Sequence, residues 1–161
     1  MKKILICGAT GFIGKNLLDH FSKNPKYTIR ATHFKRNPVP GYSEVEWVKC
    51  DLRNPEEVRD VLTDVDIVFQ FAATTTGAKD IVSKPYIHVT DNAVMNSLLL
   101  REAFEQGIEH FVFPSCTIMY QKSENALKET DFNPSDFYLD GYTTAMDGYP
   151  YSKDSQAHFG G

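Results

Sequence analysis

Three glycines spaced three residues apart, Gly8, Gly11 and Gly14, lie near the beginning of the chain. An apolar run precedes them and an amphipathic segment follows, which is typical of a strand that turns directly into a helix. Glycine permits the tight turn and close approach of the backbone to a ligand, and the first amides of the helix then face an anion. The spacing predicts a cradle for the pyrophosphate of a dinucleotide. The alternative is that the glycines only punctuate a turn.

A second pattern that could carry chemistry is Tyr149, followed four residues later by Lys153. A free tyrosine has a pKa of about 10, too high for a base at neutral pH. A lysine one turn further along the same helix face could favour the phenolate. Because Pro150 disfavours helix for the residue before it, we place Tyr149 at the entrance of a helix. The pair predicts a proton-transferring site, and surface tyrosines beside a lysine are the alternative.

The choice of dinucleotide depends on the end of the second predicted strand. An NAD site places a carboxylate about twenty residues after the glycines, where it binds the ribose 2′-hydroxyl. This chain has no carboxylate in residues 31–36 and carries Lys35 and Arg36 instead. Two cations suit the 2′-phosphate of NADP, which arginine can bind bidentately, better than they suit NAD. The alternative is that both side chains belong to a solvated loop.

Several short motifs in this order resemble those of the extended short-chain dehydrogenase/reductases. Within them, the nucleotide-sugar epimerases and dehydratases are the most similar, including GDP-fucose-synthase-like members. The motifs are the segment Gly8–Gly14, Asp51-Leu52, Phe71-Ala72-Ala73, Asn92, Ser115-Cys116-Thr117 before Tyr120, and Tyr149-x-x-x-Lys153. The resemblance covers the whole chain but only the cofactor-binding half of such an enzyme. It therefore implies that the family's C-terminal substrate domain is absent from this chain.

In the catalytic role that the resemblance implies, Tyr149 exchanges a proton with a sugar hydroxyl or carbonyl while hydride moves to or from the nicotinamide. Lys153 would also hold the nicotinamide ribose. The family's third group, a Ser or Thr, falls on Cys116 when counted back from Tyr120. Because a thiol is a weak donor, we expect its neighbours Thr117 or Ser115 to contact the substrate. Cys116 would then be an epimerisation acid/base or a buried structural residue.

For the cofactor, the resemblance implies that Asp51 and Leu52 lie by the adenine, and that Ala72 and Ala73 lie against the ribose and pyrophosphate. The complete predicted cofactor set is Gly8, Thr10, Gly11, Phe12, Ile13, Gly14, Lys35, Arg36, Asp51, Leu52, Ala72, Ala73, Thr74, Asn92 and Lys153. The predicted function is an NAD(P)-dependent oxidoreductase, epimerase or dehydratase acting on a nucleotide sugar. A non-catalytic or partner-dependent NADP-binding module is the alternative. A third and weaker hypothesis is an isomerase or reductase that acts on a non-sugar carbonyl.

Strand-like and helix-like segments alternate along the whole chain. We predict strands over residues 3–7, 27–34, 46–50, 66–72 and 109–115, and helices over 11–23, from Asn54 and Pro55 onward, over 91–106 and after Tyr149. The first helix is expected to turn Phe12, Ile13, Leu17, Leu18 and Phe21 toward the sheet. Alternation predicts an α/β fold, a Rossmann-like doubly wound parallel sheet with helices on both faces, formed by residues 1–161 as one domain.

Composition limits the partners of the chain. Its 161 residues carry a net charge of −4, which favours neither nucleic acid nor an anionic membrane. No apolar run is long enough for a membrane span and no secretory signal is visible, so we expect a cytoplasmic protein. The three cysteines, Cys7, Cys50 and Cys116, show no metal-ligand spacing, and we expect Cys7 and Cys50 to be buried. The family resemblance also implies a homodimer through the long helices near Asn92 and Tyr149.

Overall fold

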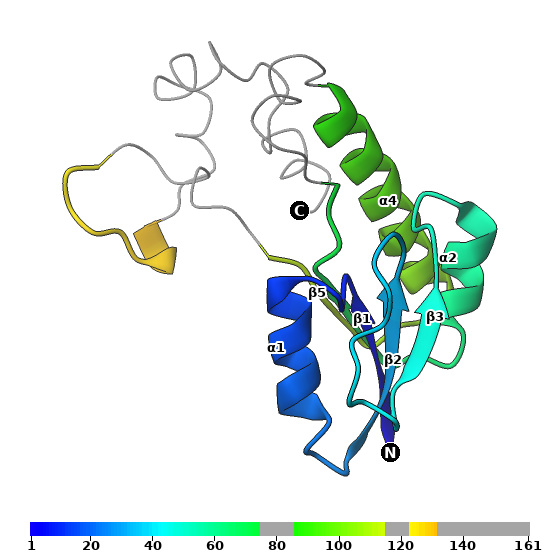
Figure 1. Ribbon diagram of the computed structural model, residues 1–161. Coiled ribbons are helices and arrows are strands. Elements are labelled where there is room, and N and C mark those ends of the chain that lie inside the picture. Colours follow the sequence, from blue (N-terminus) through cyan, green and yellow to red (C-terminus); the bar gives the residue numbers. More distant parts are fainter. Residues whose placement is uncertain (75–85, 115–122, 132–161) are drawn as a thin grey trace. The chain divides into compact units, whose positions relative to one another are not determined.

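A five-stranded parallel sheet forms the core of the fold. The structure is a computed structural model that describes residues 1–74, 86–114 and 123–131. The strands are β1 (Lys2–Cys7), β2 (Tyr27–His33), β3 (Glu46–Lys49), β4 (Ile67–Gln70) and β5 (His110–Val112), in the order β3-β2-β1-β4-β5 (Figure 1). This order confirms the predicted Rossmann-like fold. The connections reverse direction between β1 and β4, the switch point where such sheets bind ligands.

The chain divides into two compact units. The first, which contains the sheet, comprises Met1–Ala73 and Val94–Pro114. The second comprises Thr74–Ala93 and Ser115–Gly161, of which residues 74, 86–93 and 123–131 are described. Its described elements are the first turns of α4 (Tyr86–Glu105) and the short 3-10 helix η2 (Glu129–Asp131). The assignment of residues 1–161 to one domain stays a prediction.

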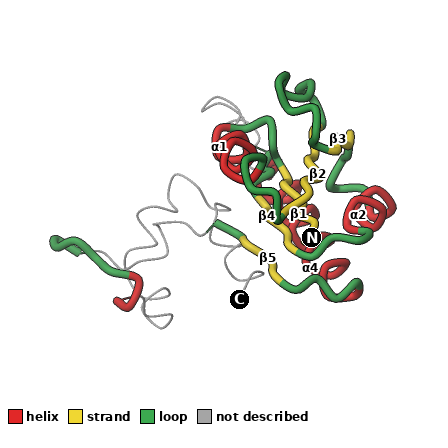
Figure 2. The backbone as a smooth tube through the Cα atoms, turned by 90° about the horizontal axis from the view of Figure 1, so that it is seen from below, coloured by secondary structure: helices red, strands yellow, loops and turns green. Residues whose placement is uncertain are grey.

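Side chains of β1 alternate between two apolar cores, one on each face of the sheet. Ile4 and Ile6 join a core that includes Leu18 of α1 (Phe12–Phe21), whereas Leu5 and Cys7 join the core on the other face. That second core contains Val58, Val61 and Leu62 of α2 (Pro55–Leu62) with Met95 and Leu99 of α4. Figures 1 and 2 show α1 on one face, with α2 and α4 on the other. The alternation explains why residues 4–7 of β1 are all apolar.

The prediction for the sheet-facing side of α1 is wrong at two positions. Phe12 is 87% exposed and Ile13 is 49% exposed. The buried residues of the helix are Gly14 and Leu18, and Phe21 packs beside them against Phe69 with ring centroids 5.2 Å apart. Because Gly14 occupies the inward position of the first turn, the two residues before it project outward.

The second helix begins as predicted. Asn54 is the N-cap of α2, and its side-chain oxygen accepts from the amides of Glu56 and Glu57 at 3.0 and 3.4 Å. Pro55 occupies the first helical position, where its missing N–H costs nothing. These contacts join residues two or three positions apart, so the local sequence is sufficient to start the helix.

Helix α4 begins at Tyr86, five residues before the predicted start at Asp91. Pro85 precedes it in the sequence, a start signal that the prediction did not use, and the β-branched residues that follow weaken a helical pattern. Its buried side chains include Met95, Leu99 and Ala103. Gly107 ends the helix with a positive φ of 68°, in agreement with the predicted stop.

Two cysteines belong to the core on the α2 and α4 face, as predicted. Cys7 and Cys50 are both buried and both are free thiols. Burial raises the pKa of Cys7 and raises that of Cys50 to about 12. Because only a thiolate is an effective nucleophile, both residues are structural at neutral pH.

Arg30 connects β2, β3 and the end of α2. Its Nη1 donates to the carbonyls of Val61 and Thr63, at 2.9 and 2.8 Å, and its Nη2 lies 2.9 Å from Oε1 of Glu46. A positive charge at the C-terminal end of a helix also interacts favourably with the helix dipole. The hydrogen bond from Arg30 holds the pKa of Glu46 below its ordinary value of 4.5.

This pair predicts a dependence of stability on pH. Because the pKa of Glu46 is lower in the folded chain, its ion pair stabilises the fold above the unfolded pKa, and that contribution is lost as pH falls through the folded value. We expect Glu46→Gln to reduce the loss of unfolding free energy between about pH 5 and about pH 3, measured by urea denaturation. Glu44→Gln, an exposed neighbour, is the control. Equal pH dependence in wild type and Glu46→Gln would contradict the assignment.

Candidate cofactor-binding site

The glycine turn at the end of β1 is built by close backbone contacts. Gly8 has a φ of +75°, and a Cβ there would lie 2.7 Å from the Cα and N of Ala72. A Cβ at Gly14 would lie 2.3 Å from the carbonyl oxygen of Gly8. Gly11 donates its N–H to that oxygen at 2.9 Å. Gly8 and Gly14 are therefore required by packing, whereas a Cβ at Gly11 would meet only the Gly8 oxygen, at 3.2 Å.

The turn leaves the start of α1 open to an anion. Gly11 is the N-cap, no described side chain caps this end, and the first turn contains no acidic residue. The amides of Phe12, Ile13 and Gly14 precede the first helical hydrogen bond, which Lys15 makes to Gly11 at 2.9 Å. Open amides at the positive end of a helix bind phosphate. Phe12 and Ile13, whose side chains are exposed, can contribute through their backbone, and Thr10 lies partly buried in the turn.

The end of β2 is joined to the glycine turn and places the two predicted cations nearby. The hydroxyl of Thr32 accepts from the amide of Gly8 at 3.2 Å. Beyond it, Nδ1 of His33 lies 3.0 Å from the carbonyl oxygen of Arg36, which closes a short turn. Lys35 and Arg36 are both exposed on this turn. Because the strands are parallel, the turn lies at the same edge of the sheet as Gly8.

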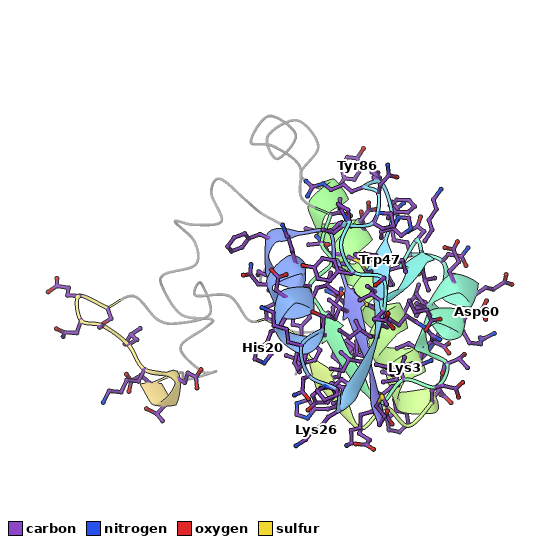
Figure 3. All side chains as sticks on the ribbon, turned by 60° about the horizontal axis from the view of Figure 1, so that its bottom comes forward. Lys3, His20, Lys26, Trp47, Asp60 and Tyr86 are labelled. Atoms are coloured by element: carbon purple, nitrogen blue, oxygen red, sulfur yellow. The ribbon has the colours of Figure 1, made fainter. Side chains whose placement is uncertain are left out.

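The aromatic ring of Trp47 on β3, labelled in Figure 3, lies beside this turn. Its centroid is 6.3 Å from that of His33, in an edge-on arrangement. The carbonyl of His33 also accepts from the amide of Cys50 at 2.9 Å, which joins the ends of β2 and β3. Trp47 is the single tryptophan of the chain, so its emission can report on a ligand bound near His33.

Asp51 and Leu52, which follow β3 and are predicted to lie by the adenine, have different surroundings. Leu52 is buried in the core, so only its backbone can reach a ligand. The carboxylate of Asp51 pairs with Arg53 through two hydrogen bonds, from Nε at 2.9 Å and from Nη2 at 2.8 Å. The guanidinium of Arg53 also lies 5.6 Å from the centroid of the Phe34 ring. Hydrogen bonds from Arg53, and more weakly the charge of Lys35, lower the pKa of Asp51.

The sequence prediction missed a buried glutamine that shapes the end of β4. Gln70 is 1% exposed and its side chain bonds both the N–H and the C=O of Ala72, each at 3.1 Å. Its Nε2 also donates to Oδ1 of Asn96 on α4 at 2.8 Å. Strand β4 ends at Gln70 and not at Ala72 as predicted, and the N–H of Ala72 donates to the Gln70 side chain. The bonds from Gln70 hold Ala72 against Gly8. In the sequence, the signal for this role was a polar residue in an otherwise apolar strand.

Thr74 and Asn92 are brought together within the second unit. The amide of Thr74 donates to Oδ1 of Asn92 at 2.8 Å, and Nδ2 of Asn92 donates to the carbonyl of Thr74 at 3.1 Å. Asn92 therefore holds the backbone of Thr74 through both its N–H and its C=O. Both residues belong to the predicted cofactor set.

The predicted catalytic residues Tyr149, Lys153, Ser115 and Thr117, together with Cys116, lie outside the described residues. The same holds for Tyr120 and for the predicted helix after Tyr149. Strand β5 is shorter than predicted and ends at Val112, two residues before Pro114, which cannot donate to a ladder. The described residues therefore include the part of the site that is predicted to bind the adenosine and pyrophosphate of the cofactor.

Residues 1–74, 86–114 and 123–131 contain neither a metal-binding cluster nor a membrane-spanning helix. No three His, Cys, Asp or Glu side chains converge there in a way that could hold a metal ion. No helix in those ranges has both the length and the apolar character needed to cross a membrane.

A family model for the NAD dependent epimerase/dehydratase family matches residues 4–153 of this chain. The chain belongs to this family. Similar family members include GDP-mannose 3,5-epimerase 1 of Oryza sativa subsp. indica, with 28% identity over 83% of this chain and 37% of that protein. GDP-L-fucose synthase of Azorhizobium caulinodans has 27% identity over 89% of this chain and 43% of that protein. The chain thus spans less than half the length of these curated relatives.

Solved epimerase structures share the fold. UDP-glucuronic acid 4-epimerase from Bacillus cereus, solved with UDP-glucuronic acid and NAD, has a TM-score of 0.68 and 25% identity, covering 91% of this chain and 49% of its own. The epimerase Mth375 from Methanothermobacter thermautotrophicus has a TM-score of 0.70 and 24% identity, covering 82% of this chain and 41% of its own. This chain therefore matches less than half of each of these solved chains.

Proposed function

We propose that this chain binds NADP and takes part in the NADP-dependent oxidoreduction, epimerisation or dehydration of a nucleotide sugar. The observation that carries the proposal is the family match over residues 4–153, which contains both the glycine turn and the Tyr149/Lys153 pair. The open amides of α1 fit a pyrophosphate, since no carboxylate lies in that first turn. The names of the similar proteins support a nucleotide-sugar substrate.

NADP is the proposed cofactor because of the charges at the end of β2. The turn that follows β2 presents Lys35 and Arg36 without a carboxylate, and both side chains are exposed. A 2′-phosphate can accept charge-assisted hydrogen bonds from both, whereas the 2′-hydroxyl of NAD cannot use their charge. The contact between His33 and the carbonyl of Arg36 orders this turn before the ligand arrives.

The proposed chemistry is shared between the cofactor and four side chains. Bound NADP supplies the position to or from which hydride moves. Tyr149 holds or accepts the proton of the sugar oxygen, and Lys153 favours the phenolate and binds the nicotinamide ribose. Thr117 or Ser115 orients that oxygen by a hydrogen bond. A cytoplasmic location and a homodimer stay predictions from the sequence.

A second candidate function is an NADP-binding module without turnover of its own, or one that depends on a partner. Hydride exchange between NADP(H) and a panel of nucleotide sugars separates the two candidates. Exchange with any sugar supports the enzyme, binding of NADPH without exchange favours the module, and absence of NADPH binding contradicts both.

The cofactor choice makes a quantitative prediction. Lys35→Gln combined with Arg36→Gln should weaken NADPH binding about 10–100-fold, because each lost charge-assisted bond costs roughly one factor of ten. NADH binding should change less than about twofold, since it lacks the 2′-phosphate. Titration followed by Trp47 emission measures both. Lys23→Gln combined with Lys26→Gln, which removes two exposed lysines near the amino end of β2, is the charge-matched control. Equal losses for NADPH and NADH would contradict the assignment.

A further inference from the structure

The edge of the sheet that is proposed to bind the 2′-phosphate also carries a carboxylate. Asp51 follows β3, and its hydrogen-bond partner Arg53 lies 5.6 Å from the ring of Phe34, the residue directly before Lys35. An anion bound by Lys35 would therefore experience repulsion from Asp51, since at this partly exposed edge solvent screens the charges only in part. The site needs a way to cancel that negative charge if it is to prefer a phosphate to a hydroxyl.

Arg53 is held against Asp51 by several contacts. The guanidinium donates to both carboxylate oxygens, and the backbone N–H of Arg53 donates to Oδ1 at 3.1 Å. The ring of Phe34, from the turn after β2, lies against the same guanidinium. A bidentate pair that also packs on an aromatic ring has a defined geometry, unlike most surface ion pairs. Phe34 precedes Lys35 directly, so the pair is joined to the proposed phosphate site.

We propose that Arg53 determines the preference for NADP indirectly, by neutralising Asp51 so that a 2′-phosphate can bind at Lys35 and Arg36. This inference rests on the proposed function. In the wild type, the proposed site carries a net charge of two positive units, summed over the side chains of Lys35, Arg36, Asp51 and Arg53. Arg53→Gln leaves one net positive charge, and Asp51→Asn combined with Arg53→Gln restores two. Arg53 is thus a positioning and charge-balancing residue, and Lys35 and Arg36 are the ligands.

The test isolates the 2′-phosphate by comparing two small ligands. Dissociation constants of adenosine 2′,5′-bisphosphate and adenosine 5′-phosphate are measured by calorimetry on the whole 161-residue chain. We expect Arg53→Gln to lower the preference for the bisphosphate about three- to tenfold at low salt, and by less at about 0.5 M salt, where screening is stronger. Asp51→Asn/Arg53→Gln should return the preference to within about twofold of wild type. Arg53→Lys, which keeps the positive charge, should retain most of the preference for the bisphosphate.

Arg101→Gln is the matched control. Arg101 on α4 is also an exposed arginine beside a carboxylate, with Nη2 3.7 Å from Oε1 of Glu102, and its loss changes the net charge equally. It should leave the preference unchanged.

The possible outcomes separate this inference from the proposed cofactor. A wild type that prefers the bisphosphate, with Arg53→Gln unchanged, overturns the role of Arg53 and leaves NADP in place. A loss in Arg53→Gln that the double variant does not restore overturns charge balancing and makes Arg53 a direct phosphate ligand. A wild type that binds both ligands equally overturns the NADP proposal, and this inference with it.

Discussion

Gly8→Ala should lower the free energy of unfolding by about 2–5 kcal/mol and abolish dinucleotide binding. The new Cβ would lie 2.7 Å from the backbone of Ala72, and the residue would keep a φ of +75° that suits glycine. The conformation costs about 1–2 kcal/mol for an L-residue, and overpacking typically adds about 1–3 kcal/mol. Chemical denaturation measures the stability, and NADPH titration measures the binding.

Two other glycines separate the causes of this loss. Gly107 also has a positive φ, but a Cβ there would meet nothing within 4 Å, so Gly107→Ala should cost only the conformational part. Gly11→Ala tests the cradle in a folded chain, because its Cβ would meet only the Gly8 oxygen, at 3.2 Å. We expect Gly11→Ala to change stability by less than about 1 kcal/mol and to weaken NADPH binding at least about tenfold. Wild-type affinity in Gly11→Ala would contradict the pyrophosphate assignment.

Tyr149→Phe should reduce hydride exchange with the nucleotide-sugar substrate by about 10²–10⁴-fold, the usual contribution of a general acid or base. Phenylalanine keeps the ring but cannot hold or transfer the proton. Lys153→Met should cause a comparable loss, because without the nearby ammonium the phenolate is disfavoured at neutral pH. Single-turnover exchange at saturating NADP separates this loss from weaker cofactor binding.

Tyr151→Phe is the matched control for this pair. Tyr151 lies only two residues before Lys153, so in the predicted helix the two side chains would not share a face, and the loss of the Tyr151 hydroxyl should leave exchange unchanged. Exchange at the wild-type rate in both Tyr149→Phe and Lys153→Met would refute the proposed chemistry. A larger loss in Tyr151→Phe than in Tyr149→Phe would reassign the acid/base to Tyr151.

The sequence was sufficient for features that depend on neighbouring residues. The Asn54 cap and Pro55 start of α2 involve contacts over two or three positions, and the structure confirms them. The glycine turn is similarly local, since Gly11 and Gly14 both lie against the carbonyl of Gly8, within six positions in the sequence. Alternation of strand and helix signals was enough for the parallel sheet, because right-handed crossovers leave few other arrangements.

Only the tertiary structure decided which side chains the sheet edge brings together. Phe12 was predicted to face the sheet but is exposed, because Gly14 occupies the inward position. Gln70 orders Ala72 with the help of Asn96, twenty-six residues away in sequence. Arg30 likewise bonds the end of α2 more than thirty residues later.

The glycine turn that opens the chain is thus readable from its spacing, as is the positive charge of Lys35 and Arg36. The sequence also shows the carboxylate of Asp51. It does not show that the charge of this carboxylate is neutralised. That depends on Arg53 being held by Phe34, which the fold brings from the end of another strand. Local patterns therefore predict where this chain binds phosphate. The selectivity proposed for that site depends on contacts between distant residues, because the segments that follow β2 and β3 set the charge balance together.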